Sequence, residues 1–183
     1  MKGTSLLLTQ VDVLDELLHT HAGALGRDFT AYRNHAYRVL NLCVAQSSEE
    51  PRQLEKIAIA AAFHDLGIWT DATFDYLPPS VRLASAHLLQ TGREDRTSEV
   101  SAMILEHHKI TRYRGDANWL VEPFRRADWV DVTRGLVRFG LPRSMVREIF
   151  ARWPSAGFHE LLVQLELTRL RTHPFSPLPM MRL

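Results

Sequence analysis

Apolar residues recur at helical spacing along most of the chain. Leu14, Leu17 and Leu18, for example, fall on one face of a helix, and glycines at the end of that segment supply a stop signal. The same pattern predicts helices in residues 12–25, 28–46, 48–67, 78–90, 97–107, 121–139, 141–153 and 160–172. No alternating apolar and polar stretch long enough for a strand competes with it. The sequence therefore predicts an all-α fold.

Length and composition indicate that these helices form one domain. The chain has 183 residues, close to a prior of about 150 residues per domain. Apolar residues make up 45% of the chain and charged residues 23%, as in ordinary globular proteins. The chain ends in the proline-rich stretch HPFSPLPMMRL. We therefore assign residues 1–171 to a single helical domain and residues 172–183 to an extended Pro-rich tail.

Charge and composition exclude several classes of partner. The formal net charge is +1, and no block of lysine and arginine is long enough to follow a phosphate backbone. The first residues contain only three consecutive leucines, too few for a signal peptide or a membrane span. We expect a cytoplasmic protein that binds neither nucleic acid nor membrane, and homo-oligomerisation stays open. The single cysteine, Cys43, lies among apolar residues and is expected to be a packed thiol.

Histidines and aspartates interrupt the apolar faces of several predicted helices. His64 and Asp65, for example, directly follow the small apolar run AAAF. The full set is His35, His64, Asp65, His87, His107, His108 and Asp128. Each such group, if buried alone and unsatisfied, would cost roughly 1–3 kcal/mol, and a shared metal ion removes that cost. Imidazole and carboxylate ligands without cysteine suit one or two divalent transition-metal ions (Fe, Mn, Co, Ni or Zn), with Mg as a further option.

The order of these residues resembles the HD superfamily of metal-dependent phosphohydrolases. Its members carry a helix-borne His, a His-Asp pair and a later Asp on an all-helical scaffold. The matching residues are His35 in YRNHAYRV, His64 and Asp65 in FHDLGIW, and Asp128 in RRADWVDV. The resemblance covers about residues 28–135. It implies an HD-type helical bundle in which these four residues hold a first metal ion.

The two-metal members of that superfamily add histidines between the His-Asp pair and the last Asp. By this resemblance, Asp65 would bridge to a second ion held by His87 and by one or both of His107 and His108. A single-metal site, with these histidines lining the substrate pocket, is the alternative that the resemblance leaves open.

The resemblance also implies hydrolysis of a small phosphate ester or nucleotide by metal-activated water. Such ions lower the pKa of bound water toward about 7 and clamp the attacking and leaving oxygens. We expect Asp65 and Lys109 to act in catalysis. We expect Arg38, Lys109 and Arg112 to bind an anionic small-molecule substrate, because they are cationic and close in sequence to the proposed ligands.

Other chemistries share the same ligand pattern. One branch of the superfamily, which includes myo-inositol oxygenase-like enzymes, uses a similar His/Asp shell to hold two irons that activate oxygen. A mixed-valence diiron oxygenase is therefore the principal alternative. A metal-dependent hydratase or lyase and a non-enzymatic ligand-binding module are further alternatives. The chain lacks the Gly-Tyr-Pro signature of the cyclic-di-nucleotide branch after its histidine pair, so we do not predict that substrate.

Overall fold

All regular secondary structure in the described part of the chain is helical. The computed structural model describes residues 7–47, 50–172 and 180–181, so most of the predicted tail lies outside the described residues. The helices are α1 (Asp12–Thr20), α2 (Ala22–Leu25), η1 (Gly26–Asp28), α3 (Phe29–Val44), α4 (Pro51–Phe63), α5 (Gly67–Thr70), α6 (Leu77–Gln90), η2 (Glu94–Arg96), α7 (Thr97–Glu106), α8 (Val121–Val132), α9 (Arg143–Arg152) and α10 (Phe158–Thr172). The predicted all-α, single-domain fold is confirmed.

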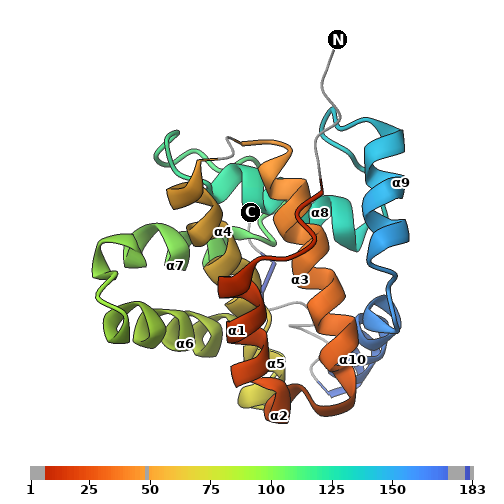
Figure 1. Ribbon diagram of the computed structural model, residues 1–183. Coiled ribbons are helices and arrows are strands. Elements are labelled where there is room, and N and C mark those ends of the chain that lie inside the picture. The colour runs from red at the N-terminus through yellow and green to blue at the C-terminus, as the bar shows by residue number, and fades with distance from the viewer. Residues whose placement is uncertain (1–6, 48–49, 173–179, 182–183) are drawn as a thin grey trace.

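Helix α3 runs through the middle of the bundle (Figure 1). It packs along α8 and α4, and α1 also packs on α4. Helices α6 and α7 form a pair beside α4, and α9 and α10 lie on the opposite side of the molecule (Figure 1). Leu40, Ile59, Val100 and Phe124, from four of these helices, are fully buried. Burying each such side chain contributes about 1.5–3 kcal/mol, so this shared core holds the helices in place.

Helix α8 ends earlier than the sequence pattern predicts. It stops at Val132 rather than at residue 139, because Arg134 and Gly135 have positive φ angles of 51° and 76°. The Gly135 N–H donates to the carbonyl of Val130 at 2.8 Å, and the Arg134 N–H donates to that of Asp131 at 2.8 Å. These two bonds form a Schellman-type helix end, for which Gly135 was the available sequence signal.

The His64-Asp65 pair lies in a turn between two helices. Helix α4 ends at Phe63, and α5 begins at Gly67, where the sequence pattern predicts the end of a single helix. A Cβ atom on Gly67 would lie 2.5 Å from the carbonyl oxygen of Tyr76, so the glycine permits close packing of α5 against the start of α6. Because the backbone turns here, two successive side chains face the same interior space.

The sequence offers Ser48 as a cap and Pro51 as an early proline for the helix that becomes α4, and Asp28 as a cap for the one that becomes α3. Pro51 does stand in the first turn of α4, whereas Ser48 lies outside the described residues. Asp28 makes no side-chain cap for α3. Its carboxylate instead accepts a hydrogen bond from the indole N–H of Trp69 at 3.1 Å, which ties α5 to the start of α3.

Cys43 is free and buried, as predicted. Burial raises the pKa of its thiol well above the ordinary value, which keeps it protonated and unreactive. Among the described helices, none combines the length and the apolar character needed to cross a bilayer.

Candidate metal centre

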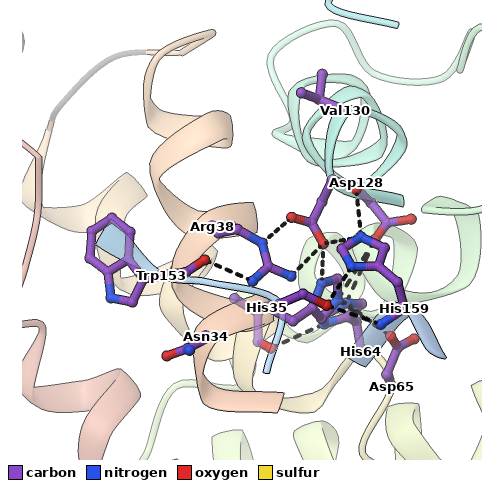
Figure 2. Close-up of polar contacts among 12 residues, drawn as sticks. Asn34, His35, Arg38, His64, Asp65, Asp128, Val130, Trp153 and His159 are labelled. Carbon is purple, nitrogen blue, oxygen red and sulfur yellow. Dashed lines mark hydrogen bonds and ion pairs between the residues drawn. The ribbon is translucent and has the colours of Figure 1, made fainter. Parts of the chain in front are cut away.

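Six of the seven predicted ligands converge on one buried space in the bundle. Figure 2 shows three of them, His35, His64 and Asp128, pointing toward one another from α3, the end of α4 and α8. Asp65 follows His64 in the turn, and the adjacent pair His107 and His108 follows α7. All are at most 2% exposed except His108, which is partly buried. Ionisable side chains are rarely buried together in a protein core unless they pair with one another or bind a metal ion.

These side chains form three overlapping groups in which each residue offers one ligand atom. Within each group the ligand atoms lie within 4.8 Å of one another. The groups are His35, His64 and Asp128; His64, Asp65 and His107; and His107, His108 and Asp128. Because neighbouring groups share members, the cluster is continuous and could hold more than one metal ion.

The closest approach in the cluster joins two imidazole nitrogens. Nε2 of His35 and Nε2 of His64 lie 2.8 Å apart. The Nδ1–H of His35 donates to Asp131 at 2.7 Å, and the Nδ1–H of His64 donates to the Ala61 carbonyl at 3.0 Å. In neutral rings both Nε2 atoms would therefore present lone pairs to each other. Two nitrogens bound to one ion at about 2.1 Å and at right angles lie about 3.0 Å apart, so this spacing suits a shared cation.

Without a cation, a second proton on His35 relieves this contact. Burial by itself lowers the pKa of His35, but the carboxylates of Asp131 and Asp65 together outweigh it and raise that pKa to about 9. Burial lowers the pKa of His64 to about 3, so the ring of His64 stays neutral and accepts. A proton and a metal ion therefore compete for Nε2 of His35.

The carboxylate of Asp65 lies between two halves of the cluster, one formed by His35 and His64 and the other by His107 and His108. Its Oδ2 lies 3.4 Å from Nε2 of His35 and 3.4 Å from Nε2 of His64. Its Oδ1 lies 3.3 Å from Nε2 of His107. The Nδ1–H of His107 donates to the Ile104 carbonyl at 2.7 Å, which directs Nε2 toward Asp65. This arrangement is compatible with the predicted bridging role of Asp65.

The carboxylate of Asp128 also lies between these two halves, with one oxygen near His35 and His64 and the other near His108. Its Oδ1 lies 3.8 Å from Nε2 of His35 and 3.9 Å from Nε2 of His64, and its Oδ2 lies 3.5 Å from Nδ1 of His108. Burial raises the pKa of Asp128 to about 7, because the ionised form has lost its hydration. A bound cation would offset that cost.

Several ligand atoms of the cluster have no hydrogen-bond partner among the described residues. They are Oδ1 of Asp65, Nε2 of His107 and both oxygens of Asp128. Buried polar atoms are almost always paired, and leaving one unpaired costs about 1–3 kcal/mol. Nitrogen and oxygen atoms that are buried, unpaired and directed at a common space fit a divalent transition metal.

The sequence analysis missed a further residue, Asp131, which accepts the hydrogen bond from Nδ1 of His35 on the side of the ring away from the cluster. Asp131 lies one turn after Asp128 on the same face of α8, and its carboxylate also pairs with the guanidinium of Arg38. His159, at the start of α10, donates from Nε2 to the backbone carbonyl of Asp131 at 2.9 Å. The spacing of three residues between Asp128 and Asp131 was the available signal in the sequence.

His87 does not reach the cluster, so the structure gives no support to its predicted role as a ligand of the second ion. The buried positions of α6 include Ala84 and Leu88, and His87 lies beside this stripe on a different face. Its ring is 5.8 Å from that of Phe63, and it lines a separate cavity with His21. Burial lowers the pKa of His87, which suits a neutral packing residue.

The geometry gives no support to the prediction that Arg38 binds an anionic substrate, because its guanidinium forms a buried ion pair with Asp131. Arg38 is fully buried and forms a two-pronged ion pair with Asp131, in which the Nη2–Oδ2 distance is 3.0 Å. Its Nη1 donates to the carbonyls of Trp153 at 3.0 Å and Pro154 at 3.3 Å (Figure 2). Arg38 is therefore a structural cation that holds α3, α8 and the end of α9 together.

Lys109 and Arg112 line a surface cavity that contains none of the six converging residues. The ammonium of Lys109 is 3.8 Å from the carboxylate of Glu106. The carbonyl of Lys109 accepts a hydrogen bond at 3.1 Å from the indole of Trp129, the residue that follows the candidate ligand Asp128. The geometry therefore gives no support to catalysis or substrate binding by these two side chains.

A small cavity of about 170 Å³ reaches the cluster at His108 and Asp128. Phe74 and Tyr76, from the segment between α5 and α6, form part of its wall. The hydroxyl oxygen of Tyr76 lies 2.5 Å from Nε2 of His108. This hydrogen bond connects the wall of the cavity to a candidate ligand.

Comparison of the chain with protein-family models, with curated proteins and with solved structures gives no match. The all-helical fold with its buried His/Asp groups is compatible with an HD-like fold. Those groups could hold a metal ion, which is compatible with a metalloenzyme.

Proposed function

We propose that this protein is an HD-type phosphohydrolase that hydrolyses a small phosphate ester at a two-ion centre. His35, His64, Asp65 and Asp128 would hold the first ion, in agreement with the resemblance to the HD superfamily. Asp65 and Asp128 would bridge to a second ion held by His107 and His108. The observation that carries the proposal is that both carboxylates span the two halves of the cluster.

Ions in such a centre lower the pKa of a coordinated water toward about 7 and polarise the phosphoryl oxygens of the substrate. The overall reaction consumes one water, breaks the ester P–O bond and releases phosphate and an alcohol, which takes up a proton from that water. The carboxylate of Asp65 is kept in the ionised form that a metal ligand requires. Burial opposes its ionisation, but His64, His107 and His35 together lower its pKa well below the ordinary value.

The protein itself orients the ligands and excludes water. Asp131 fixes the ring of His35 through Nδ1, and Tyr76 fixes that of His108 through Nε2. Burial, together with the negative charges of Asp65 and Asp128, raises the pKa of Tyr76 well above its ordinary value, so its hydroxyl keeps its proton. Pre-oriented ligands and a dry surrounding increase the effect of a metal ion on a bound phosphate.

The test is release of phosphate by metal-loaded protein. Protein stripped with a chelator would be reloaded separately with Mn²⁺, Co²⁺, Ni²⁺, Zn²⁺ or Mg²⁺ and assayed against a panel of small phosphomonoesters and nucleotides. We expect metal-dependent release that is lost in His64→Ala and kept in His87→Ala, since His87 lies outside the cluster. Absence of release from every ester with every metal would contradict the proposal.

A second candidate is the mixed-valence diiron oxygenase, which uses the same kind of ligands. The observation that favours it is the largely apolar wall of the cavity, which includes Val132, Leu162 and Met180. Elemental analysis with electron paramagnetic resonance distinguishes the two: about two irons per chain and a mixed-valence signal would favour the oxygenase.

A further inference from the structure

We infer that the substrate of the proposed hydrolase carries a small cationic head group, an alkylammonium or quaternary ammonium, which binds in the cavity beside the metal ligands. This inference rests on the proposed function for the phosphate end of the substrate. The cavity that would hold the cationic end is the one that reaches His108 and Asp128, and its wall includes Phe74, Tyr76, Trp129 and Glu166.

The charge of the cavity wall is the first argument. Among the described residues that line it, none is a lysine or an arginine, whereas two, Asp128 and Glu166, carry carboxylates. Glu166 is exposed and belongs to α10, on the side of the cavity formed by that helix. With Asp128 engaged by the proposed metal ions, the remaining charge of the wall is that of Glu166, which would repel a further anionic group and attract a cationic one.

The aromatic side chains are the second argument. The rings of Phe74 and Tyr76 have centroids 6.4 Å apart and planes inclined at 74°, so they form two walls at nearly right angles. The indole of Trp129, held by its hydrogen bond to the Lys109 carbonyl, lines the same cavity. A cation within about 6 Å of an aromatic centroid is attracted to the ring face, and several rings around one cavity are the usual means of binding quaternary ammonium groups.

The size of the cavity limits the head group. Its volume of about 170 Å³ is below the range of about 300–1,000 Å³ that is common for pockets that bind drug-sized ligands. A choline or ethanolamine group is of a suitable size, whereas a nucleoside is too large for the space described. The structure thus favours a small zwitterionic ester over the nucleotide that the sequence left open.

The first arm of the test compares two esters that differ only at one atom. Phosphocholine carries a quaternary nitrogen where 3,3-dimethylbutyl phosphate carries a carbon. We expect kcat/KM for phosphocholine to be about tenfold higher or more, the size of a desolvated cation–π contact aided by a carboxylate. We expect Glu166→Gln to reduce this preference several-fold and the surface control Glu148→Gln in α9 to leave it unchanged.

The second arm separates the inference from the proposed function, because it requires no hydrolysis. Calorimetric titration of the metal-loaded protein would compare choline with 3,3-dimethylbutanol. Tighter binding of choline, weakened in Glu166→Gln, supports the cation site even if neither these two esters nor any ester of the panel is hydrolysed, in which case the hydrolase proposal alone fails. Hydrolysis of both esters without preference for phosphocholine would overturn the inference and leave the hydrolase standing. Neither hydrolysis nor preferential binding would overturn both.

Discussion

Oδ2 of Asp131 lies 2.7 Å from Nδ1 of His35, and this contact sets which nitrogen of His35 faces the His/Asp cluster. The carboxylate is itself held by the guanidinium of Arg38. Burial opposes ionisation of Asp131, but the charges of Arg38 and His35 lower its pKa well below the ordinary value. In the proposed metal centre, Asp131 would therefore be a positioning residue that acts through His35.

Asp131→Asn should weaken metal binding without removing any ligand. The amide loses the negative charge that makes His35 a stronger ligand, and loss of such a partner lowers metal affinity by about 10–100-fold. Competition with a chromophoric chelator measures this affinity. Ser155→Ala is the matched control, because Ser155 contacts His159 and not His35. Equal affinity in Asp131→Asn and the wild type would show that Asp131 serves the fold alone.

Gly67 should tolerate no side chain at the start of α5. In Gly67→Ala, the new Cβ would meet the Tyr76 carbonyl at 2.5 Å and Cβ of Pro79 at 3.0 Å. We expect a loss of about 1–3 kcal/mol in the free energy of unfolding, as for other overpacked sites, measured by urea denaturation. Gly23→Ala in α2 is the control: nothing lies within 4 Å of its Cβ, and alanine favours helix, so stability should be equal or slightly higher. Equal stability of the two variants would contradict the packing described for α5.

Glu122 should stabilise the protein in a pH-dependent way. Its carboxylate accepts hydrogen bonds from the side chains of Arg125 and Arg126, each at 2.8 Å, and from the backbone N–H of Tyr113 at 2.9 Å. Burial would raise its pKa, but these bonds, led by that from Arg125, lower it to about 2. Because the folded pKa is below the unfolded one, the stabilisation is present above about pH 4.5 and is lost as pH falls toward about 2.

Glu122→Gln should therefore be less stable than the wild type near pH 7, by about 1 kcal/mol after allowance for the partial exposure of the pair. The difference between the two proteins should shrink as pH falls below about 4.5. Denaturation of both at a series of pH values measures it. A difference that stays constant down to pH 3 would mean that the ionised carboxylate contributes nothing.

Much of the fold and most of the buried His/Asp cluster could be predicted from the sequence. Helical periodicity and the Leu, Ile and Phe stripes place the helices, and the apolar setting of His35 and His64 indicates that both point inward. The end of α4 was harder to place, because Gly67 is a stop signal that here begins the next helix. Local pattern does not determine such a turn, since it depends on the packing of α5 against α6.

The predicted roles of His87 and Arg38, which the geometry does not support, depend on tertiary packing. His87 lies one position from the buried Leu88, and only the packed position of α6 decides which of these residues faces the core. Arg38 shares a helix face with His35, but its ion-pair partner Asp131 comes from α8. The packing of α3 against α8 is a long-range contact, and the apolar periodicity within each helix does not determine it.

The most direct test of the metal centre is the metal content per chain, measured by elemental analysis on four proteins reloaded in the same way. The wild type and His87→Ala should each hold about two ions, because His87 lies outside the cluster. His64→Ala and His107→Ala should each hold clearly less metal, with helical circular dichroism like that of the wild type. Full metal content in both of these variants, or a loss confined to His87→Ala, would contradict the account.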